Sequence, residues 1–181
     1  MINNCPKITV VTVNLNNSSG LEMSIKSYLS QNTEYSELVV VDGMSNDGSS
    51  DVIESYAGAI NKLICEQDQG IFDAMNKGVL NAGGEFVYFL NSGDTFYDKD
   101  VLSNFYKSCN SDKRIYYGGM EFHLDNVGID RVNDADTWVC HQSTFIPRYL
   151  LRQELFDVNL KVFGDSYFWE RIERFNVPWQ R

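Results

Sequence analysis

Four polar side chains follow four apolar segments in the first half of the chain, each at the point where the segment ends. They are Asn14, Asp42, Asp68 and Asp94. If the apolar segments are parallel strands, their carboxyl ends meet at the edge of the sheet where ligands bind. Carboxylate oxygens there suit a hard divalent cation that bridges to phosphate oxygens. Taken alone each residue is an ordinary loop residue, but together they predict a nucleotide cleft.

The segment from Phe86 to Asp94 shows how the sequence positions one of these carboxylates. Residues 86–90 form a short, aromatic-rich apolar run, which predicts a buried strand. Gly93 allows a tight turn after it, so that Asp94 is presented at the carboxyl end of the strand. The four residues 91–94 also have the composition of an ordinary loop, and by themselves they do not decide between the two interpretations.

Strands and helices are predicted to alternate through residues 8–90. Runs rich in β-branched and apolar residues at 8–13, 37–42, 62–65 and 86–90 predict strands. Apolar residues at helical spacing predict a helix after each of the first three strands. This order implies right-handed crossovers and a mostly parallel, Rossmann-like α/β sheet with helices on both faces.

The alternation weakens after Asp94. A helix is predicted near residues 101–106, followed by strands at 115–117 and 120–124 that form an antiparallel hairpin across two glycines. Residues 125–137 predict an exposed loop, Pro147 opens a helix, and a last helix begins near Asp165. We expect one domain over residues 1–181, with a first part at 1–98 and a second at 99–181.

Composition excludes several classes of protein. A chain of 181 residues with 43% hydrophobic residues can form one domain with a sizeable core. A net charge of −10 argues against a nucleic-acid partner. Residues 148–181 hold six basic and five acidic side chains. The segment therefore has a net charge of +1. A solvated helical face explains this charge, and the alternative is contact with an anionic lipid surface or with pyrophosphate.

The cysteine spacing and the hydropathy of the chain indicate the cellular compartment. Cys5, Cys65, Cys109 and Cys140 are far apart in sequence, so their spacing supports neither a zinc cage nor a disulfide framework. There is no apolar run of about 20 residues and no signal-peptide pattern. We therefore expect a cytoplasmic protein with buried thiols.

Six segments spread over most of the chain carry motifs that occur together in one known family. They are Ile8 to Asn14, Val39 to Gly48, Asp68 to Gly78, Leu90 to Asp94, Cys140 to Gln142 and Phe163 to Asp165. In this combination the chain resembles family 2 glycosyltransferases with the GT-A fold, in the bacterial surface-polysaccharide branch of colanic-acid and O-antigen transferases. The resemblance implies an inverting hexosyltransferase with a UDP- or GDP-sugar donor. Its acceptor would be lipid-linked or an oligosaccharide, at the cytoplasmic face of the membrane.

The resemblance also implies that residues 1–98 form the nucleotide-sugar donor half and residues 99–181 the acceptor half, and it implies roles for individual residues. The donor-binding residues would be Val13, Asn14, Asp42, Asp68, Gly70, Asn76, Ser92 and Gly93. Asp94 would coordinate Mn²⁺ or Mg²⁺, which stabilises the charge that builds on the departing diphosphate. Asp165 would be the general base that deprotonates the acceptor hydroxyl, with a helix N-cap as the alternative. His141 is either a cleft residue near the diphosphate or a structural histidine, and a structural role is favoured for His123.

The chain departs from the family pattern around the metal. Gly43, Asn91 and Gly93 stand where many relatives carry further acidic residues. Asp94 alone is then left to bind the metal, so we expect the cation to enter together with the nucleotide sugar.

Two further departures concern charge and length. Met75 stands where many relatives carry arginine, so the diphosphate charge must be met elsewhere, with Lys77 as a candidate. Relatives usually continue beyond the position of Arg181, so an acceptor-binding or membrane-docking segment is expected to be missing.

The residues alone leave two other functions possible. A catalytically silent fragment would bind a nucleotide sugar without turnover. A dinucleotide-binding or receiver-like α/β module is the other alternative, but residues 14–20 contain no G-x-G-x-x-G.

Overall fold

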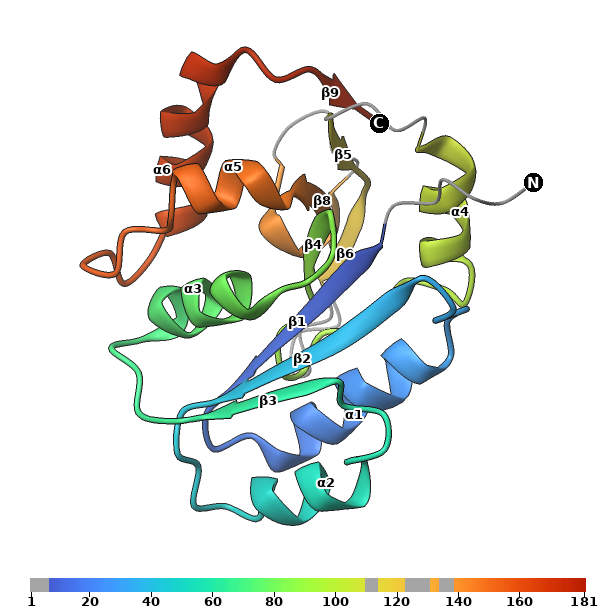
Figure 1. Ribbon diagram of the computed structural model, residues 1–181, viewed down its shortest axis with the longest axis vertical. Coiled ribbons are helices and arrows are strands. Elements are labelled where there is room, and N and C mark those ends of the chain that lie inside the picture. The colour runs from blue at the N-terminus through green and yellow to red at the C-terminus, as the bar shows by residue number, and fades with distance from the viewer. Residues whose placement is uncertain (1–6, 110–113, 123–130, 134–138) are drawn as a thin grey trace.

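The computed structural model has a central sheet with helices on both faces (Figure 1) and describes residues 7–109, 114–122, 131–133 and 139–181. The sheet has seven strands in the order β3-β2-β1-β4-β8-β5-β9. They are β1 (Ile8–Asn14), β2 (Ser36–Asp42), β3 (Lys62–Cys65), β4 (Phe86–Phe89), β5 (Ile115–Tyr117), β8 (Thr144–Pro147) and β9 (Trp179–Gln180). Strands β3, β2, β1 and β4 run parallel, and β8 is antiparallel to β4. The predicted, mostly parallel α/β sheet is confirmed.

The register of β1 fixes the edge at which the polar side chains meet. Every residue of β1 is buried, as its β-branched sequence predicts for a strand covered on both faces. Ile8 is paired with Ser36 of β2, and Asn14 is paired with Asp42 at the other end. Because β1 and β2 therefore end side by side, the first two predicted strand-end residues lie next to each other.

The helices divide into two layers. The helices are α1 (Ser18–Leu29), α2 (Ser49–Ser55), α3 (Ile71–Asn81), α4 (Val101–Ser108), α5 (Arg148–Gln153) and α6 (Gly164–Ile172). Core residues of α3, α5 and α6 pack with Val11 and Val13, whereas those of α1 and α4 pack with Ile8 and Val10. Figure 1 shows α3 and α1 on opposite sides of β1 and β2. Of the helices in the described ranges, none is long and apolar enough to cross a bilayer.

The fold contains an added antiparallel strand pair, as predicted, but residues 115–117 and 120–122 each pair with other strands and not with one another. Strand β5 pairs with β8 and β9, which occupy both of its edges. Strand β6 (Met120–Phe122) instead forms a separate antiparallel pair with β7 (Arg131–Asn133). β7 lies inside the segment that was expected to be an exposed loop. His123 falls outside the described residues.

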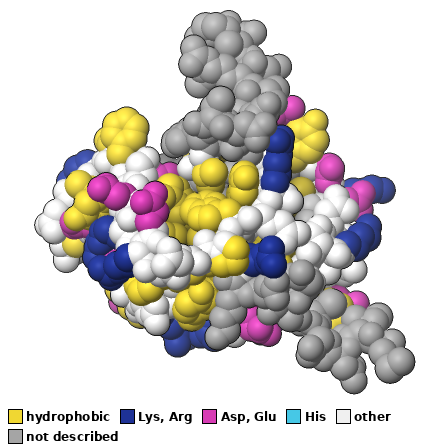
Figure 2. Space-filling model, turned by 90° about the horizontal axis from the view of Figure 1, so that it is seen from above, with side chains coloured by type: hydrophobic (Ala, Val, Ile, Leu, Met, Phe, Trp, Pro, Cys, Tyr) yellow, Lys and Arg dark blue, Asp and Glu magenta, His cyan; other side chains and the backbone are white. Residues whose placement is uncertain are grey.

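The sheet ends at an aromatic edge. The ring of Trp179 in β9 packs against Tyr117 of β5 and Trp169 of α6, with centroids 5.9 and 5.3 Å away. Seen from above in Figure 2, this end of the molecule has hydrophobic side chains gathered between basic and acidic ones. Since β4 pairs with β8, the same sheet also runs across the boundary between the two predicted halves.

Candidate functional site

A row of hydrogen bonds joins the ends of three neighbouring strands. Asn14 Nδ2 donates to Asp42 Oδ2 over 2.7 Å, and Ser92 Oγ donates to Asn14 Oδ1 over 2.7 Å. Asn14 and Asp42 are each only 3% exposed. The structure thus brings together predicted residues from the ends of β1, β2 and β4.

A cavity of about 230 Å³ opens beside this row. Five predicted donor-binding residues line it: Val13, Asn14, Asp68, Gly70 and Ser92. Gly70 has φ 126°, a backbone conformation that favours glycine, and its N–H donates to Asp68 Oδ1 over 2.9 Å. The loop after β3 and the ends of β1 and β4 therefore form one concave surface, which polar and apolar side chains line together.

Asp42 lies behind Asn14 instead of lining this cavity. Its Oδ1 accepts from the backbone N–H of Ser45 over 2.8 Å, and its Oδ2 accepts from the Ser45 hydroxyl over 2.7 Å. Both carboxylate oxygens are thus engaged in holding the loop that leads to α2. Asp42 fixes the position of Asn14 and of this loop.

The side chains of Asn76 and Lys77 do not line the 230 Å³ cavity. The Asn76 amide donates to Phe156 O over 2.9 Å and accepts from Phe156 N over 3.0 Å, which ties α3 to the chain after α5. The Lys77 ammonium lies 3.1 Å from Glu66 and 3.3 Å from Asp73. Its charge is neutralised there, which disfavours Lys77 as the partner of a diphosphate.

We expect Asn76→Ala to destabilise the fold without weakening nucleotide binding. The change leaves the buried N–H and carbonyl of Phe156 without partners, which costs about 2–4 kcal/mol. Denaturant unfolding measures the stability, and calorimetry measures nucleotide affinity. Asn81→Ala is the matched control, since the partly buried Asn81 on the same helix makes one bond to Lys77 O. A variant of wild-type stability that loses nucleotide affinity would restore Asn76 to the donor site.

Asp94 lies in a second cavity, of about 310 Å³, which Gly93 and Gln142 also line. Gly93 has φ 103°, in agreement with the predicted turn. Burial raises the pKa of Asp94, opposed by a hydrogen bond to Gln142 and the charge of His141. Among the described residues, the buried Asp94 Oδ2 has no hydrogen-bond partner. A buried carboxylate oxygen without a partner is costly, and as a hard donor it fits Mn²⁺ or Mg²⁺.

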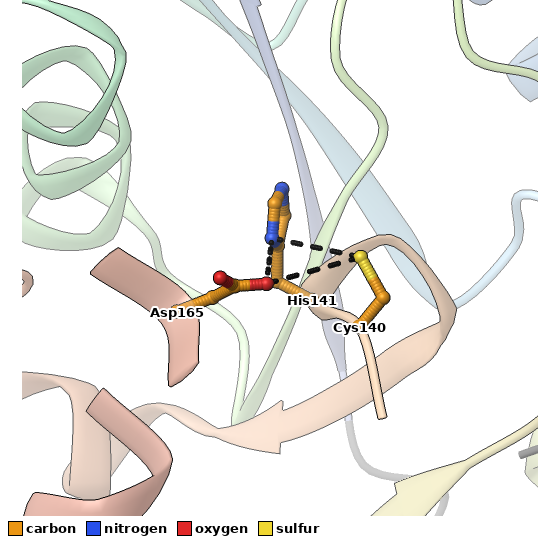
Figure 3. A group of neighbouring side chains, drawn as sticks. All are labelled: Cys140, His141 and Asp165. Atoms are coloured by element: carbon orange, nitrogen blue, oxygen red, sulfur yellow. Dashed lines mark hydrogen bonds and ion pairs between the residues drawn. The ribbon is translucent and has the colours of Figure 1, made fainter. Parts of the chain in front are cut away.

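Cys140, His141 and Asp165 form a buried cluster (Figure 3), in which the Asp165 carboxylate comes from α6. His141 Nδ1 lies 3.0 Å from Asp165 Oδ2, and Cys140 Sγ lies 3.9 Å from each of these atoms. His141 Nε2 lies 3.3 Å from Asn91 Nδ2, and Asn91 lines the 230 Å³ cavity. His141 therefore connects Asp165 to the edge of the sheet.

Asp165 and His141 form an ion pair at neutral pH. Burial alone would lower the pKa of His141, but hydrogen bonds to Asp165 and Cys140 raise it to about 9. Burial acts to raise the pKa of Asp165, and the bond to His141 outweighs it, so that this pKa is lowered. A half-turn of the Asn91 amide would bring its oxygen to the second N–H of the imidazolium.

The alternative of a helix N-cap for Asp165 is wrong. The N-cap of α6 is Phe163, in a left-handed conformation with φ 60°, and Asp165 lies within the first turn. Asp165 Oδ1 accepts from the N–H of Ser166 over 2.9 Å. Its other oxygen faces His141, and a carboxylate in the first turn is favoured by the helix dipole.

The ion pair predicts that stability falls as the pH rises. The pKa of His141 in the folded chain, about 9, lies above its ordinary 6.5, so the folded state binds this proton more tightly. That stabilisation is complete below pH 6.5 and is lost as the pH rises to about 9, by about 3 kcal/mol at most. Urea unfolding at several pH values measures it. Asp165→Asn should remove this decline, and an unchanged decline in the variant would contradict the pairing.

Sequence reasoning missed two side chains around the site, Gln142 and Lys161. The Gln142 amide lies between Asp94 and Cys140: it bonds the carboxylate, and its oxygen accepts from the thiol. Lys161 Nζ donates to Gln69 O over 3.4 Å, beside Gly70. Residues 140–142 are polar residues within an apolar segment, and this pattern could have indicated that Gln142 belongs to the site. The position of Lys161 depends on contacts far along the chain.

Comparisons with known proteins show the family of this chain. The family model described as glycosyl transferase family 2 matches residues 9–171. A PGL/p-HBAD biosynthesis glycosyltransferase of Mycobacterium tuberculosis (strain ATCC 25177 / H37Ra) is 28% identical over 155 residues, which cover 80% of this chain and 60% of that protein. A putative teichuronic acid biosynthesis glycosyltransferase, TuaG of Bacillus subtilis (strain 168), is 32% identical over 105 residues, covering 56% of this chain and 41% of TuaG. The chain thus spans 60% or less of the length of these two relatives.

Solved structures show the same fold. The mannosyltransferase PcManGT from Pyrobaculum calidifontis, in complex with GDP-Man and Mn²⁺, superposes with a TM-score of 0.77 at 20% identity. The match covers 99% of this chain and 55% of that one. The predicted GT-A fold is thereby confirmed.

Proposed function

This chain belongs to glycosyl transferase family 2, and we propose that it moves a sugar from a nucleoside-diphosphate sugar to an acceptor hydroxyl, with inversion. The strongest support is the placement of three features at one edge of the sheet: the 230 Å³ cavity, the unpartnered Asp94 oxygen and the Asp165–His141 pair. A donor pocket, a cation ligand and a base are the parts that such a transfer requires.

The donor is proposed to occupy the cavity at the ends of β1 and β4. Val13, Asn14, Asp68, Gly70 and Ser92 line it and would contact the nucleotide. Asp42 would act by holding Asn14. Positive charge for the diphosphate would come from Lys161, because Met75 is fully buried, Lys77 is paired with acids and His141 is paired with Asp165.

Asp94 is proposed to hold Mn²⁺ or Mg²⁺ through its unpartnered oxygen. When bound, the cation supplies the positive charge that stabilises the negative charge developing on the departing diphosphate. Gln142 orients the carboxylate, and Gly93 makes the turn that directs it into the second cavity. The Mn²⁺ in the PcManGT complex supports this type of cation.

Asp165 is proposed to take the proton of the acceptor hydroxyl. Because its pKa is lowered, the carboxylate is ionised at neutral pH and can accept that proton. The acceptor oxygen forms a bond to the anomeric carbon while the bond to the diphosphate oxygen breaks. One displacement of this kind inverts the configuration. His141 orients Asp165 through the 3.0 Å hydrogen bond.

The acceptor is proposed to be a lipid-linked or oligosaccharide precursor of a bacterial surface polysaccharide such as O-antigen, at the cytoplasmic face of the membrane. The name of TuaG supports a polysaccharide product. Residues 1–98 would form the donor half, and residues 99–181 the acceptor half.

Release of nucleoside diphosphate tests this function without a known acceptor. The chain is incubated with a panel of UDP- and GDP-sugars and Mn²⁺, and nucleotide release is followed by chromatography. Proton NMR then gives the anomeric configuration of the sugar released to water or transferred to an oligosaccharide. We expect a β-configured product from an α-linked donor. A retained configuration would contradict the mechanism, and nucleotide binding without any release would indicate a catalytically silent fragment.

A further inference from the structure

Cys140, His141 and Asp165 bring three different metal-binding groups to one buried point. Cys140 Sγ lies 3.9 Å from His141 Nδ1 and 3.9 Å from Asp165 Oδ2, and the latter two atoms lie 3.0 Å apart. The three residues are 3%, 8% and 6% exposed. Figure 3 shows the thiol, the imidazole and the carboxylate directed toward one another.

This spacing suits one zinc ion. Zinc bonds to sulfur at about 2.3 Å and to nitrogen or carboxylate oxygen at about 2.0–2.2 Å, so its tetrahedral ligand atoms lie roughly 3.3–3.6 Å apart. The three observed distances of 3.9, 3.9 and 3.0 Å bracket this range, so small side-chain rotations would bring the atoms to it. The Gln142 amide oxygen, which accepts from the Cys140 thiol, or a water could take the fourth position.

We propose that Cys140, His141 and Asp165 form a Zn²⁺ site, and that Zn²⁺ bound there blocks sugar transfer by occupying the Asp165 carboxylate. The site itself rests on the geometry alone. The block rests on the proposed function of Asp165 as the base. The spacing of the cysteines did not indicate this site, because only one of its ligands is a cysteine. The others are the adjacent His141 and the carboxylate of Asp165, which is 25 positions after Cys140.

The charges of the three ligands match a dication. With Zn²⁺ bound, a thiolate, a neutral imidazole and a carboxylate surround the ion, so the buried site is neutral. Neutrality matters here because an uncompensated charge in a buried site is costly.

The ligand types separate this site from the one at Asp94. Thiolate and imidazole ligands favour zinc, whereas an isolated carboxylate oxygen suits Mn²⁺ or Mg²⁺. The donor metal would therefore bind at Asp94 while Zn²⁺ binds at the base. Gln142 contacts both places, since it bonds Asp94 and accepts from the Cys140 thiol.

Cobalt binding tests the site without an activity assay. Co²⁺ serves as the coloured substitute for Zn²⁺ in a chain whose only cysteine is Cys140, with Cys5, Cys65 and Cys109 changed to serine. We expect one Co²⁺ per chain, a near-ultraviolet thiolate-to-cobalt band, and loss of that band when Zn²⁺ is added. Absence of the band would overturn the proposal.

The matched control keeps Cys65 as the only cysteine. Its exposed thiol lies 3.8 Å from the Asp42 carboxylate and 3.8 Å from the Met44 sulfur, without an imidazole. We expect no stoichiometric band from it, and an equal band there would also overturn the proposal. Asp165→Asn in the Cys140-only chain should weaken Zn²⁺ binding by more than the roughly 10–100-fold that loss of an outer-shell partner costs. Circular dichroism checks that each variant is folded.

Inhibition is measured as the ratio of nucleotide release with and without Zn²⁺ at saturating Mn²⁺. We expect this ratio to fall well below one in the Cys140-only chain and to return to one when Cys140→Ser is added. Zn²⁺ binding without inhibition would overturn the block at Asp165 while leaving the metal site. A chain without any transfer would contradict the proposed function, and the cobalt band would then decide the metal site alone.

Discussion

Replacing Asp165 by asparagine is expected to reduce the rate of sugar transfer by roughly 10²–10⁴-fold, the usual contribution of a general base. Asparagine keeps the size of the side chain but cannot accept the acceptor proton. Nucleotide affinity should be unchanged within about threefold, since Asp165 lies behind His141 and does not line the 230 Å³ cavity. Steady-state rates and calorimetry with the diphosphate separate the two effects.

Glu170→Gln is the matched control for Asp165→Asn. Glu170 lies on the same helix, α6, and is exposed to solvent. Its replacement removes one negative charge without touching the cluster, so the transfer rate should stay at the wild-type value. Wild-type transfer by Asp165→Asn would exclude Asp165 as the base. Equal losses in both variants would point to a general effect of charge.

Asp94→Asn is expected to abolish the effect of metal on nucleotide binding. In the wild type, Mn²⁺ should tighten diphosphate binding at least tenfold, or about 1.4 kcal/mol. In the variant, the affinities with and without Mn²⁺ should be equal, because the amide is a poor metal ligand. The variant should be as stable as the wild type or more so, since the buried, partnerless carboxylate oxygen is removed.

Asp98→Asn is the matched control for Asp94. The exposed Asp98 follows in the same segment, and its carboxylate accepts from the N–H of Asp100. This variant should keep the full response to Mn²⁺. A wild-type response in Asp94→Asn would remove Asp94 from the metal site, and a lost response in Asp98→Asn would show that the whole segment, not one carboxylate, controls metal binding.

The sequence predicted the sheet and its polar edge well because both depend on local patterns. β-Branched runs specify β1 and β2, and the short crossovers specify their parallel order. Asn14 and Asp42 were expected at one edge for this reason, and the register pairs them directly. The turn at Gly93 follows from its conformational freedom, and its φ of 103° agrees.

Contacts between distant segments could not be predicted in the same way. The motif around Asn76 suggested a donor contact, but its amide bonds the backbone of Phe156, 80 residues further along the chain. The hairpin at Gly118 was predicted without knowing that β8 and β9 would take both edges of β5. The Cys140–Asp165 contact likewise requires α6 to lie close to a segment 25 residues earlier in the chain.

Calorimetric titration of the wild-type chain with UDP and GDP, each with and without Mn²⁺, is the most direct test of a nucleotide and cation site at the strand ends. We expect one of the two diphosphates to bind with one site per chain, and to bind at least tenfold more tightly with Mn²⁺. Binding of neither diphosphate in the presence of Mn²⁺ would contradict this account.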